Sequence, residues 1–417
     1  MKVRSMVCGL VLFGSAVGCG SVGATVRSQD TATSTDISVP SSVVPRSQPL
    51  GVAVTVVGTD QIVGFDAAGR AIFAGPAGHI SGDGKRLVRF SIVNGNTKVE
   101  WLSAIDGTSI ATRSVAGELV VAAVSFDGVS VALSDRDYSP LVSGEMAVGR
   151  RETNIAVVRS DTELPTQTKL MGNFSPEAFA GADLELALLE YVPAEHPTSY
   201  RVRLMTVDPI ANLQPPFGWN TKNLLDDTEV MAGHRGDHVL TEGGQYLYTL
   251  YRSSNGTAFV HALNLSYGAQ SCIDLPSDVI VSSGTIGATP DGSQLFVLTS
   301  QGKLLTIDTH TNDGSPLLPA VGRVTDLSST ALTGRLSLAV TATTVYAASA
   351  EGLATFTIGT GHIETTPTVQ APTTIVLDSS GSALFVANDS EVWQAADPTH
   401  RLELPSGIGA IVNIRVN

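Results

Sequence analysis

The chain has 417 residues, a formal net charge of −14 and an isoelectric point near 4.9. A surface this acidic repels the phosphate backbone, so nucleic acid is excluded as an expected partner. The sequence contains 41 glycines, 6% aromatic residues and only 15% charged residues, a composition typical of short buried strands and many turns. Length alone would suggest two or three domains, but a repeat in the sequence predicts one.

The first 19 residues resemble the signal segment of a bacterial lipoprotein. Lys2 and Arg4 precede an apolar stretch, residues 6–17, that is too short to span a membrane. "AVGC" at 16–19 is similar to a lipobox, although Ala16 stands where that family prefers Leu. The resemblance implies cleavage before Cys19, a diacylglycerol on its sulfur and an acyl chain such as palmitate on its nitrogen. These lipid chains together would anchor the protein stably to a membrane. The alternative is an ordinary secretory signal that ends near a cysteine.

Residues 20–49 are rich in Ser, Thr, Val and Pro and show no sustained periodicity. A flexible coil of this length would hold the following domain roughly 30 Å from a membrane surface. The alternative is an extra strand laid against that domain. The expected organisation is therefore a signal peptide at 1–18, a lipidated flexible linker at 19–49 and a folded domain at 50–417.

The segment "ATPDGSQLFVLTSQGKLLTIDTHT" at 288–311 shows the repeating unit of that domain. Asp291-Gly292 suits a tight turn, and the apolar run at 295–299 predicts a strand buried on both faces. Related turn–strand–turn–strand units begin near residues 82, 126 and 379, and more degenerate copies fill the gaps. A period of ~40–50 residues with several strands in each repeat predicts the blades of a β-propeller.

These repeats resemble known bacterial propeller families. "TPDG" at 289–292, the strands that follow it and "ALFVAND" at 383–389 are similar to YVTN/WD40-like repeats of the TolB type. "WLSAIDGTSIAT" at 101–112 resembles the pyrroloquinoline-quinone (PQQ) propeller repeat, but the tryptophan-docking position is missing, so no cofactor is implied. The resemblance implies a fold and leaves the function open, because propellers serve as enzymes, scaffolds and receptors.

The two ends of the domain predict ring closure. Residues 409–417 form a single apolar strand, and residues 51–75 supply three strands with no innermost strand before them. Joined, they complete one blade and remove an open sheet edge. We therefore expect an all-β, closed propeller of four-stranded antiparallel blades, about eight in number with seven as the alternative. Helix is expected only at 1–17 and 221–230.

The densest group of potential metal ligands is His234, Asp237 and His238. Gly236 between them predicts a loop, and the sequence lacks the glutamate of a zinc-protease helix. A solvated turn entering an inner strand is the favoured interpretation, and metal binding is the alternative. Once Cys8 leaves with the signal and Cys19 carries lipid, Cys272 has no partner for an intramolecular disulfide, and we expect it to be a buried small side chain.

Three long connections predict a partner surface: residues 138–153, 191–199 and 215–230. The last contains Phe217 and Trp219, and aromatic side chains on long loops commonly anchor a partner. The alternative for Trp219 is packing against a blade edge.

Two classes of function remain. The first is a non-enzymatic, lipid-anchored protein of the bacterial cell envelope that binds a protein or an envelope polymer. The second is a secreted lactonase- or lyase-like propeller enzyme. Carboxylates and histidines converging on one opening would favour the enzyme. The sequence shows no concentrated cluster of this kind, so the first class is preferred, with no catalytic residue assigned.

Overall fold

The computed structural model describes most of the chain from Leu50 onward. The described residues are 50–59, 61–76, 78–135, 146–180, 185–208, 212–213, 217–218, 231–253, 257–266, 269–279, 281, 283–310, 316–327, 332–366, 372–378, 380–408 and 410–416. Cys19, the signal segment and the linker lie outside them, as do Trp219 and the possible helix at 221–230. In the described part of the chain, no helix has the length and apolar character needed to cross a bilayer.

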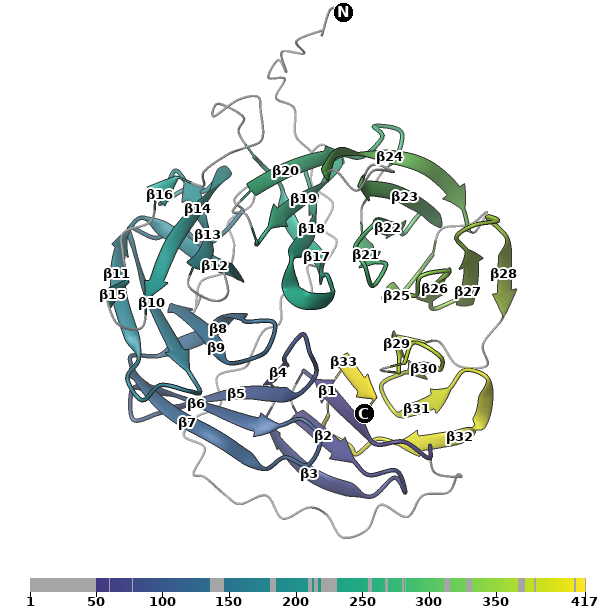
Figure 1. Ribbon diagram of the computed structural model, residues 1–417, viewed down its shortest axis with the longest axis horizontal. Coiled ribbons are helices and arrows are strands. Elements are labelled where there is room, and N and C mark those ends of the chain that lie inside the picture. The colour runs from purple at the N-terminus through teal and green to yellow at the C-terminus, as the bar shows by residue number, and fades with distance from the viewer. Residues whose placement is uncertain are drawn as a thin grey trace, which may run out of the picture. The chain divides into compact units, whose positions relative to one another are not determined.

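Eight antiparallel sheets stand around a ring as the blades of a β-propeller (Figure 1). Blade 1 contains β33 (Ile411–Val416), β1 (Val54–Gly58), β2 (Gln61–Phe65) and β3 (Ala71–Pro76). Blade 2 contains β4 (Gly78–Ile80), β5 (Arg86–Val93), β6 (Asn96–Ser103) and β7 (Ser109–Ala116). Blade 3 contains β8 (Leu119–Val124), β9 (Ser130–Asp135), β10 (Glu152–Arg159) and β11 (Thr166–Met171).

The remaining blades follow in chain order. Blade 4 contains β12 (Asn173–Ala180), β13 (Glu185–Val192), β14 (Ser199–Asp208), β15 (Asn212–Leu213) and β16 (Phe217–Gly218). Blade 5 contains β17 (His234–Leu240), β18 (Tyr246–Arg252), β19 (Ala258–Asn264) and β20 (Ala269–Asp274). Blade 6 contains β21 (Gly284–Ala288), β22 (Gln294–Thr299), β23 (Lys303–His310) and β24 (Pro316–Asp326). Blade 7 contains β25 (Ser337–Val340), β26 (Thr344–Ser349), β27 (Gly352–Thr357) and β28 (Ile363–Thr366), and blade 8 contains β29 (Thr374–Leu377), β30 (Leu384–Ala387), β31 (Glu391–Gln394) and β32 (Asp397–Glu403).

Ring closure by the two ends of the domain is confirmed. The C-terminal strand β33 pairs antiparallel with β1, so that Val56 lies opposite Ile414, and it forms the innermost strand of blade 1. Ile414 and Val416 are buried in one apolar cluster with Val54, Val56 and side chains of blade 8. The closing blade therefore joins its neighbours through a shared core, and eight blades, rather than seven, is the correct number.

The core lies between neighbouring blades, as β22 illustrates. Leu295 and Val297 pack with blade 5 side chains such as Val260, whereas Phe296 and Leu298 pack with blade 7 side chains such as Val345. Successive strand residues point to opposite faces, so a strand buried on both sides must be apolar at every position. The predicted strand at 295–299 is confirmed with this pattern.

The Asp-Gly pairs of the repeats form a common turn between the first and second strands of a blade, here called the inner turn. In blade 6, Gly292 has φ +70° and its N–H donates to the carbonyl oxygen of Thr289 at 2.8 Å. The Thr289 hydroxyl accepts from the N–H of Gln294 at 3.0 Å. The same two bonds recur at the inner turns of other blades, which begin at Ser81, Ser125, Thr241 and Asp378.

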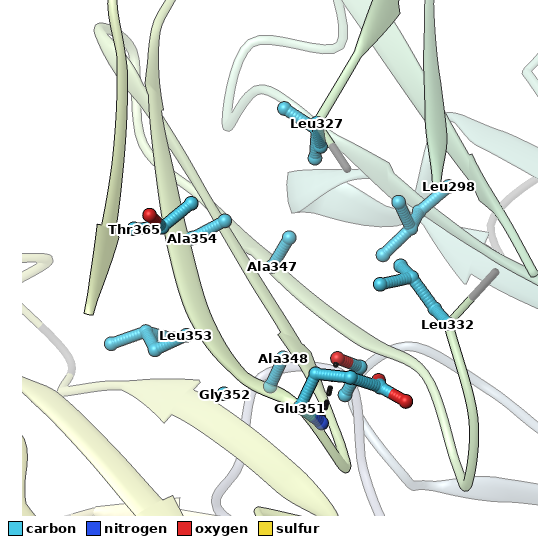
Figure 2. Close-up of a pocket in the computed structure, with 11 residues that line it drawn as sticks. Leu298, Leu327, Leu332, Ala347, Ala348, Glu351, Gly352, Leu353, Ala354 and Thr365 are labelled. Atoms are coloured by element: carbon cyan, nitrogen blue, oxygen red, sulfur yellow. Dashed lines mark hydrogen bonds between the residues drawn. The ribbon is translucent and has the colours of Figure 1, made fainter. Parts of the chain in front are cut away.

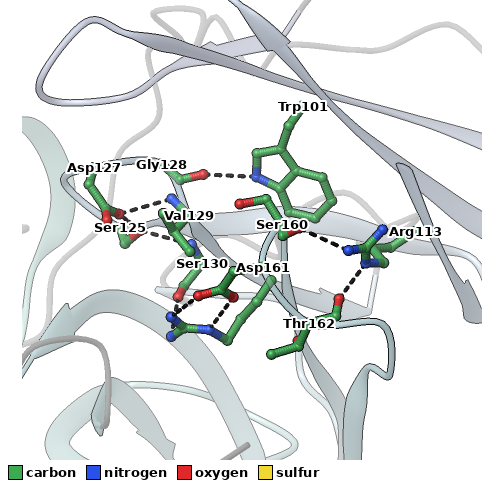
Figure 3. Close-up of polar contacts among 11 residues, drawn as sticks. Trp101, Arg113, Ser125, Asp127, Gly128, Val129, Ser130, Ser160, Asp161 and Thr162 are labelled. Carbon is green, nitrogen blue, oxygen red and sulfur yellow. Dashed lines mark hydrogen bonds and ion pairs between the residues drawn. The ribbon is translucent and has the colours of Figure 1, made fainter. Parts of the chain in front are cut away.

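Polar contacts also join adjacent blades, as between blades 2 and 3 (Figure 3). The indole N–H of the buried Trp101 donates to the carbonyl oxygen of Gly128 at 2.8 Å. The Arg113 guanidinium reaches the carbonyl oxygens of Ser160 and Thr162 in the connection that follows β10. Trp101 thus ties blade 2 to the inner turn of blade 3.

Candidate functional site

Two of the long connections predicted from the sequence meet on neighbouring blades. The residues before β10 in blade 3 run beside the connection between β13 and β14 in blade 4. The Met146 N–H donates to the Pro197 carbonyl oxygen at 2.9 Å, and the Arg150 N–H donates to the Ala194 carbonyl oxygen at 2.8 Å. Asn173, at the start of β12, donates from its side-chain amide to the carbonyl oxygens of Val148 and Ala194. These bonds hold the two connections together as one wall.

This wall and the inner strands border a half-open cavity of about 380 Å³. A cavity of this volume falls within the usual size range of small-ligand sites. It lies where β12 and β17 begin, at the opposite end of the inner strands from the inner turns. The lining residues come from blades 3, 4 and 5: Val120, Val121, Ala122, Ser134, Asp135, Ala147, Val148, Arg150, Asn173, Phe174, Ser175, Pro176, Tyr191 and Arg235.

Asp135 and Arg150 form one charged corner of the cavity. The Asp135 carboxylate accepts from the backbone N–H of Asn154 at 2.6 Å and from its side-chain amide at 2.9 Å, so each carboxylate oxygen has a protein donor. Arg150 donates from Nη2 to the backbone carbonyl oxygen of Asp135 at 3.1 Å. The corner therefore carries the positive charge of Arg150 beside a carboxylate whose two oxygens are both hydrogen-bonded.

Arg235 of β17 enters the cavity from the other side and is held by a buried carboxylate. Its Nη2 lies 3.2 Å from Oε1 of Glu177, whose side chain is 2% exposed, against 37% for that of Arg235. Glu177 sits at a bulge in the pairing of β12 with β13, between Pro176 and Ala178. A bulge adds one residue to a strand and redirects its side chain. Desolvation is the largest single influence on the pKa of Arg235 and lowers it, but the charge of Glu177 and smaller electrostatic contributions from its other neighbours together outweigh desolvation, so the net shift is upward.

A layer of buried aromatic and polar side chains lies behind Arg235 and Glu177. Tyr251 and Tyr200 stack with ring centroids 5.0 Å apart, and the Tyr200 hydroxyl lies 3.5 Å from Nδ1 of His261. Burial raises the pKa of both tyrosines well above its ordinary value, so both hydroxyls stay protonated. Within the described structure, Oε2 of Glu177 and the Tyr251 hydroxyl are buried without a hydrogen-bond partner.

The predicted metal ligands lie on strand β17 instead of on a loop. His234, Asp237 and His238 belong to the innermost strand of blade 5, and pairing with β18 shifts register between Arg235 and His238. Gly236 permits this bulge because a Cβ there would lie 2.9 Å from the carbonyl oxygen of Leu250. The loop expectation was therefore wrong: the glycine marks a bulge within a strand.

The bulge directs Asp237 toward blade 6 and away from a shared ligand set. Its Oδ2 accepts from the Thr285 hydroxyl at 2.5 Å and from the Ile286 N–H at 3.4 Å. The pKa of His238 is lowered, first by desolvation and then by the charge of Arg235, so its imidazole is neutral near pH 7. Among the described residues, no three His, Cys, Asp or Glu side chains gather as a group able to hold a metal ion.

The structure places the other sequence candidates as follows. Phe217 belongs to β16 and lies opposite Leu204 of β14, so the backbone of the third long connection joins the edge of blade 4. Cys272 lies on β20 opposite His261 and is half-buried, not fully buried as expected. Glu177, Arg235 and Tyr251 were not identified from the sequence as site residues. Glu177 and Arg235 lie at bulges, which leave no periodic signal, and Tyr251 lies within an apolar strand that predicts only burial.

A second cavity, of about 210 Å³, lies between blades 6 and 7 (Figure 2). Leu298, Leu327 and Leu332 face Ala347 and Ala354 across it. At its rim, the Glu351 carboxylate accepts from the backbone N–H of Thr333 at 2.9 Å. Desolvation raises the pKa of Glu351, but the Thr333 and Ser349 hydrogen bonds outweigh it and lower this pKa to about 2. The carboxylate thus serves to fix the Thr333 backbone beside an apolar gap in the core.

Comparison with known proteins gives similarity in fold at low sequence identity. No protein-family model and no curated protein matches the sequence. Apo AztD from Citrobacter koseri is 15% identical, with a TM-score of 0.45 over 78% of this chain and 97% of AztD. A periplasmic gluconolactonase of Pseudomonas aeruginosa is 14% identical, with a TM-score of 0.43 over 88% and 98% of the two chains. A putative 6-phosphogluconolactonase from Bacteroides uniformis is 13% identical, with a TM-score of 0.44 over 88% and 100%. At these values no activity is transferred to this chain.

Proposed function

We propose that this protein is a non-catalytic binding module of the bacterial cell envelope, tethered to a membrane by lipid on Cys19. The observation that carries the proposal is the cavity of about 380 Å³ between the two joined connections and the inner strands of blades 3–5. Binding sites commonly lie on loops that a rigid scaffold positions, and a closed ring of eight blades is such a scaffold.

The chemistry of the cavity supports binding over bond cleavage. Among the described lining residues, the one carboxylate is that of Asp135, which accepts two hydrogen bonds from Asn154, and this holds it as a structural acceptor. Arg150 and Arg235 present donors and charge, and neither acts as a general base. The tether is supported by the sequence of residues 1–19, and the composition of 20–49 suits a spacer between the membrane and the ring.

The experiment uses the full chain with Cys19→Ser, so that lipid does not contribute to binding. Cell-wall polymer and detergent-solubilised envelope protein from the producing bacterium are each immobilised and titrated with this protein. Ala147→Trp fills the cavity from its loop wall, and Thr168→Trp on the outer strand β11 is the matched control. We expect saturable binding to one fraction that Ala147→Trp reduces at least tenfold and Thr168→Trp leaves unchanged. Equal binding by both variants, or none by the parent, would contradict the proposal.

A second candidate function rests on His238. Its neutral imidazole on the innermost strand of blade 5 has the protonation state of a general base, and the Arg235 charge that lowers its pKa lies nearby. This is the lactonase- or lyase-like alternative. Titration of the acid released from γ- and δ-lactones at constant pH tests it. Hydrolysis by the parent that His238→Gln abolishes would replace the binding module with an enzyme.

A further inference from the structure

We propose that the half-open cavity of about 210 Å³ between blades 6 and 7 binds a small uncharged molecule built on one hydrocarbon ring. This cavity, here called the blade 6–7 cavity, is separate from that of blades 3–5, so the inference goes beyond the proposed function. Leu298, Leu327 and Leu332 form one side of it, and Ala347 and Ala354 form the other (Figure 2). An apolar cavity of ~150 Å³ with walls of this kind stays dry and takes up benzene. The blade 6–7 cavity therefore has room for one ring with a short substituent.

The cavity exists because blade 7 carries two alanines where blade 6 carries larger side chains. Val297 and Ala347 are each the fourth residue of the second strand of their blade. Val297 lies opposite Leu305 on β23, and both pack against blade 5. Ala347 lies opposite Ala354 on β27, and both pack against blade 6. The apolar pair that fills the interface of blades 5 and 6 is thus reduced to two methyl groups at the interface of blades 6 and 7.

The next interface around the ring shows which shape fits this place. The sequence Leu-Phe-Val occurs at 295–297 and again at 384–386, so Val386 is the counterpart of Val297 in blade 8. Val386 lies opposite Trp393 on β31, and both belong to the buried cluster between blades 7 and 8. Trp393 is 6% exposed, so its indole ring fills that interface. A ligand ring in the blade 6–7 cavity would bury the leucine and alanine walls in the same way.

The exposure of the lining residues places the entrance of the cavity. Leu298 and Ala347 are buried, whereas Gly352 and Ala354 are half-buried and Glu351 is exposed. Solvent therefore reaches the cavity beside the start of β27. A small molecule can enter there while both blades stay folded.

The polar groups at this entrance favour an uncharged ligand over an ion. The two Glu351 oxygens accept from the Thr333 N–H at 2.9 and 3.0 Å, and the Ser349 hydroxyl accepts from the Glu351 N–H at 3.3 Å. Because the pKa of Glu351 is about 2, its carboxylate is charged at neutral pH and repels an anion. A cation would leave its hydration shell for a carboxylate that Thr333 already engages. A ligand hydroxyl among the leucine and alanine side chains would be buried without a hydrogen bond.

The test uses the full chain with Cys19→Ser and four probes of similar size: toluene, phenol, benzoate and benzylamine. Calorimetric titration in a sealed cell, at pH 7 and constant ionic strength, measures each dissociation constant. We expect toluene to bind and to raise the melting temperature saturably, since a ligand that binds only the folded protein stabilises it. Phenol should bind about threefold or more weakly, and both ions about tenfold or more weakly, because they lose hydration in the cavity. No binding of toluene would show a mere packing gap and overturn the proposal, and tighter binding of either ion than of toluene would overturn the uncharged class.

Ala354→Leu locates the site, with Thr355→Leu as the matched control. The added side chain recreates the larger pair of blade 6 and fills the cavity, so toluene should bind about tenfold or more weakly while the melting temperature stays at or above that of the parent. Thr355 is the next residue of β27 and lies opposite Tyr346 on the other face of the sheet. Thr355→Leu should therefore leave the toluene dissociation constant within about twofold of the parent value. Equal toluene binding by the parent and Ala354→Leu would place the ligand elsewhere and contradict the proposal.

Leu327→Ala keeps the proposal testable if Ala354→Leu does not fold. It enlarges the cavity from the opposite wall, because the surroundings of a truncated side chain relax only partly. Naphthalene, which has two rings, should then gain about tenfold or more in affinity relative to toluene, compared with the same ratio in the parent. An unchanged ratio would show that toluene does not occupy the blade 6–7 cavity.

Discussion

The inner turns give a measurable test of how blades are joined, through Gly128→Ala compared with Gly381→Ala. Both glycines have φ +71°, which an L-residue adopts only with strain. They differ in surroundings: a Cβ on Gly128 would lie 2.7 Å from the Cβ of Ser81 and 3.1 Å from that of Arg86, both in blade 2, whereas nothing lies within 4 Å of a Cβ on Gly381. The pair therefore separates backbone strain from an inter-blade clash.

The expected magnitudes follow from these two terms. Gly381→Ala should lower the free energy of unfolding by about 1–2 kcal/mol, the cost of a left-handed conformation for an L-residue. Gly128→Ala adds overpacking against side-chain carbons that stand next to the backbone, which typically costs about 1–3 kcal/mol more. The total for Gly128→Ala is then about 2–5 kcal/mol.

Urea unfolding followed by tryptophan fluorescence and by circular dichroism measures both variants. The midpoint should fall further for Gly128→Ala than for Gly381→Ala, with the two probes giving the same midpoint for each protein. If both variants lose the same stability, the inner turns of blades 2 and 3 do not pack as closely as the structure places them, and the argument fails.

Four other predictions follow from the sequence and the structure. Cys19→Ser should release the protein from the membrane fraction, and retention after a high-salt wash would exclude the lipid anchor. Deletion of residues 409–417 removes the buried side chains of Ile411, Ile414 and Val416, a loss of about 5–9 kcal/mol, and should abolish cooperative unfolding and promote aggregation. A truncated monomer that melts like the parent would contradict this. Zinc should not raise the melting temperature through His234 and His238, because Asp237 is hydrogen-bonded to Thr285 of blade 6. A stabilisation of the order of 2.7 kcal/mol at a hundredfold excess of zinc over its Kd, lost in His234→Ala/His238→Ala, would show a metal site. The pKa values of His79 and His238 are lowered in the folded protein, so on acidification the unfolded chain takes up protons near pH 6.5 before the folded protein does. The free energy of unfolding should therefore fall as the pH drops below 6.5. His79→Gln/His238→Gln should flatten this pH dependence in urea titrations between pH 6.5 and 5, and an unchanged slope would refute it.

The fold could be predicted because the inner turn has a local chemical requirement. A glycine at positive φ and a hydroxyl or carboxylate three residues before it are needed wherever this turn occurs, so they recur in the sequence. The turn does not require the aspartate: in blade 5, Thr241 and Gly244 make the same hydrogen bonds without an aspartate between them. Spacing and apolar runs then predicted about eight blades, with seven left open, and the pairing of the C-terminal strand with the first strand that closes the ring.

The neighbourhood of the site was partly predictable. The connections at 138–153 and 191–199 exceed what a hairpin needs, and their length marked them as candidates. That they meet depends on the registers of two different blades, which fix where Arg150 finds the carbonyl oxygen of Ala194. No local sequence pattern encodes the contact between the two connections, because the sequence of each connection would be equally suitable if that connection faced solvent.

The ion pair between Arg235 and Glu177 could not be predicted from the sequence. Regular alternation on β12 and β17 would place side chains by a period of two, but each strand contains a bulge between its first residues and its inner turn. The bulges place Glu177 in contact with Arg235 and Asp237 in contact with Thr285. Residues that are close in sequence, such as Arg235 and Asp237, therefore contact different blades. Gly236 marks the bulge of β17 and Pro176 marks that of β12, and in the sequence Gly236 indicated a loop. Because these irregularities interrupt the ladder of β12 and β17, they persist only where the rest of the ring holds the strands in place, and here they hold Arg235 at the cavity against the buried Glu177.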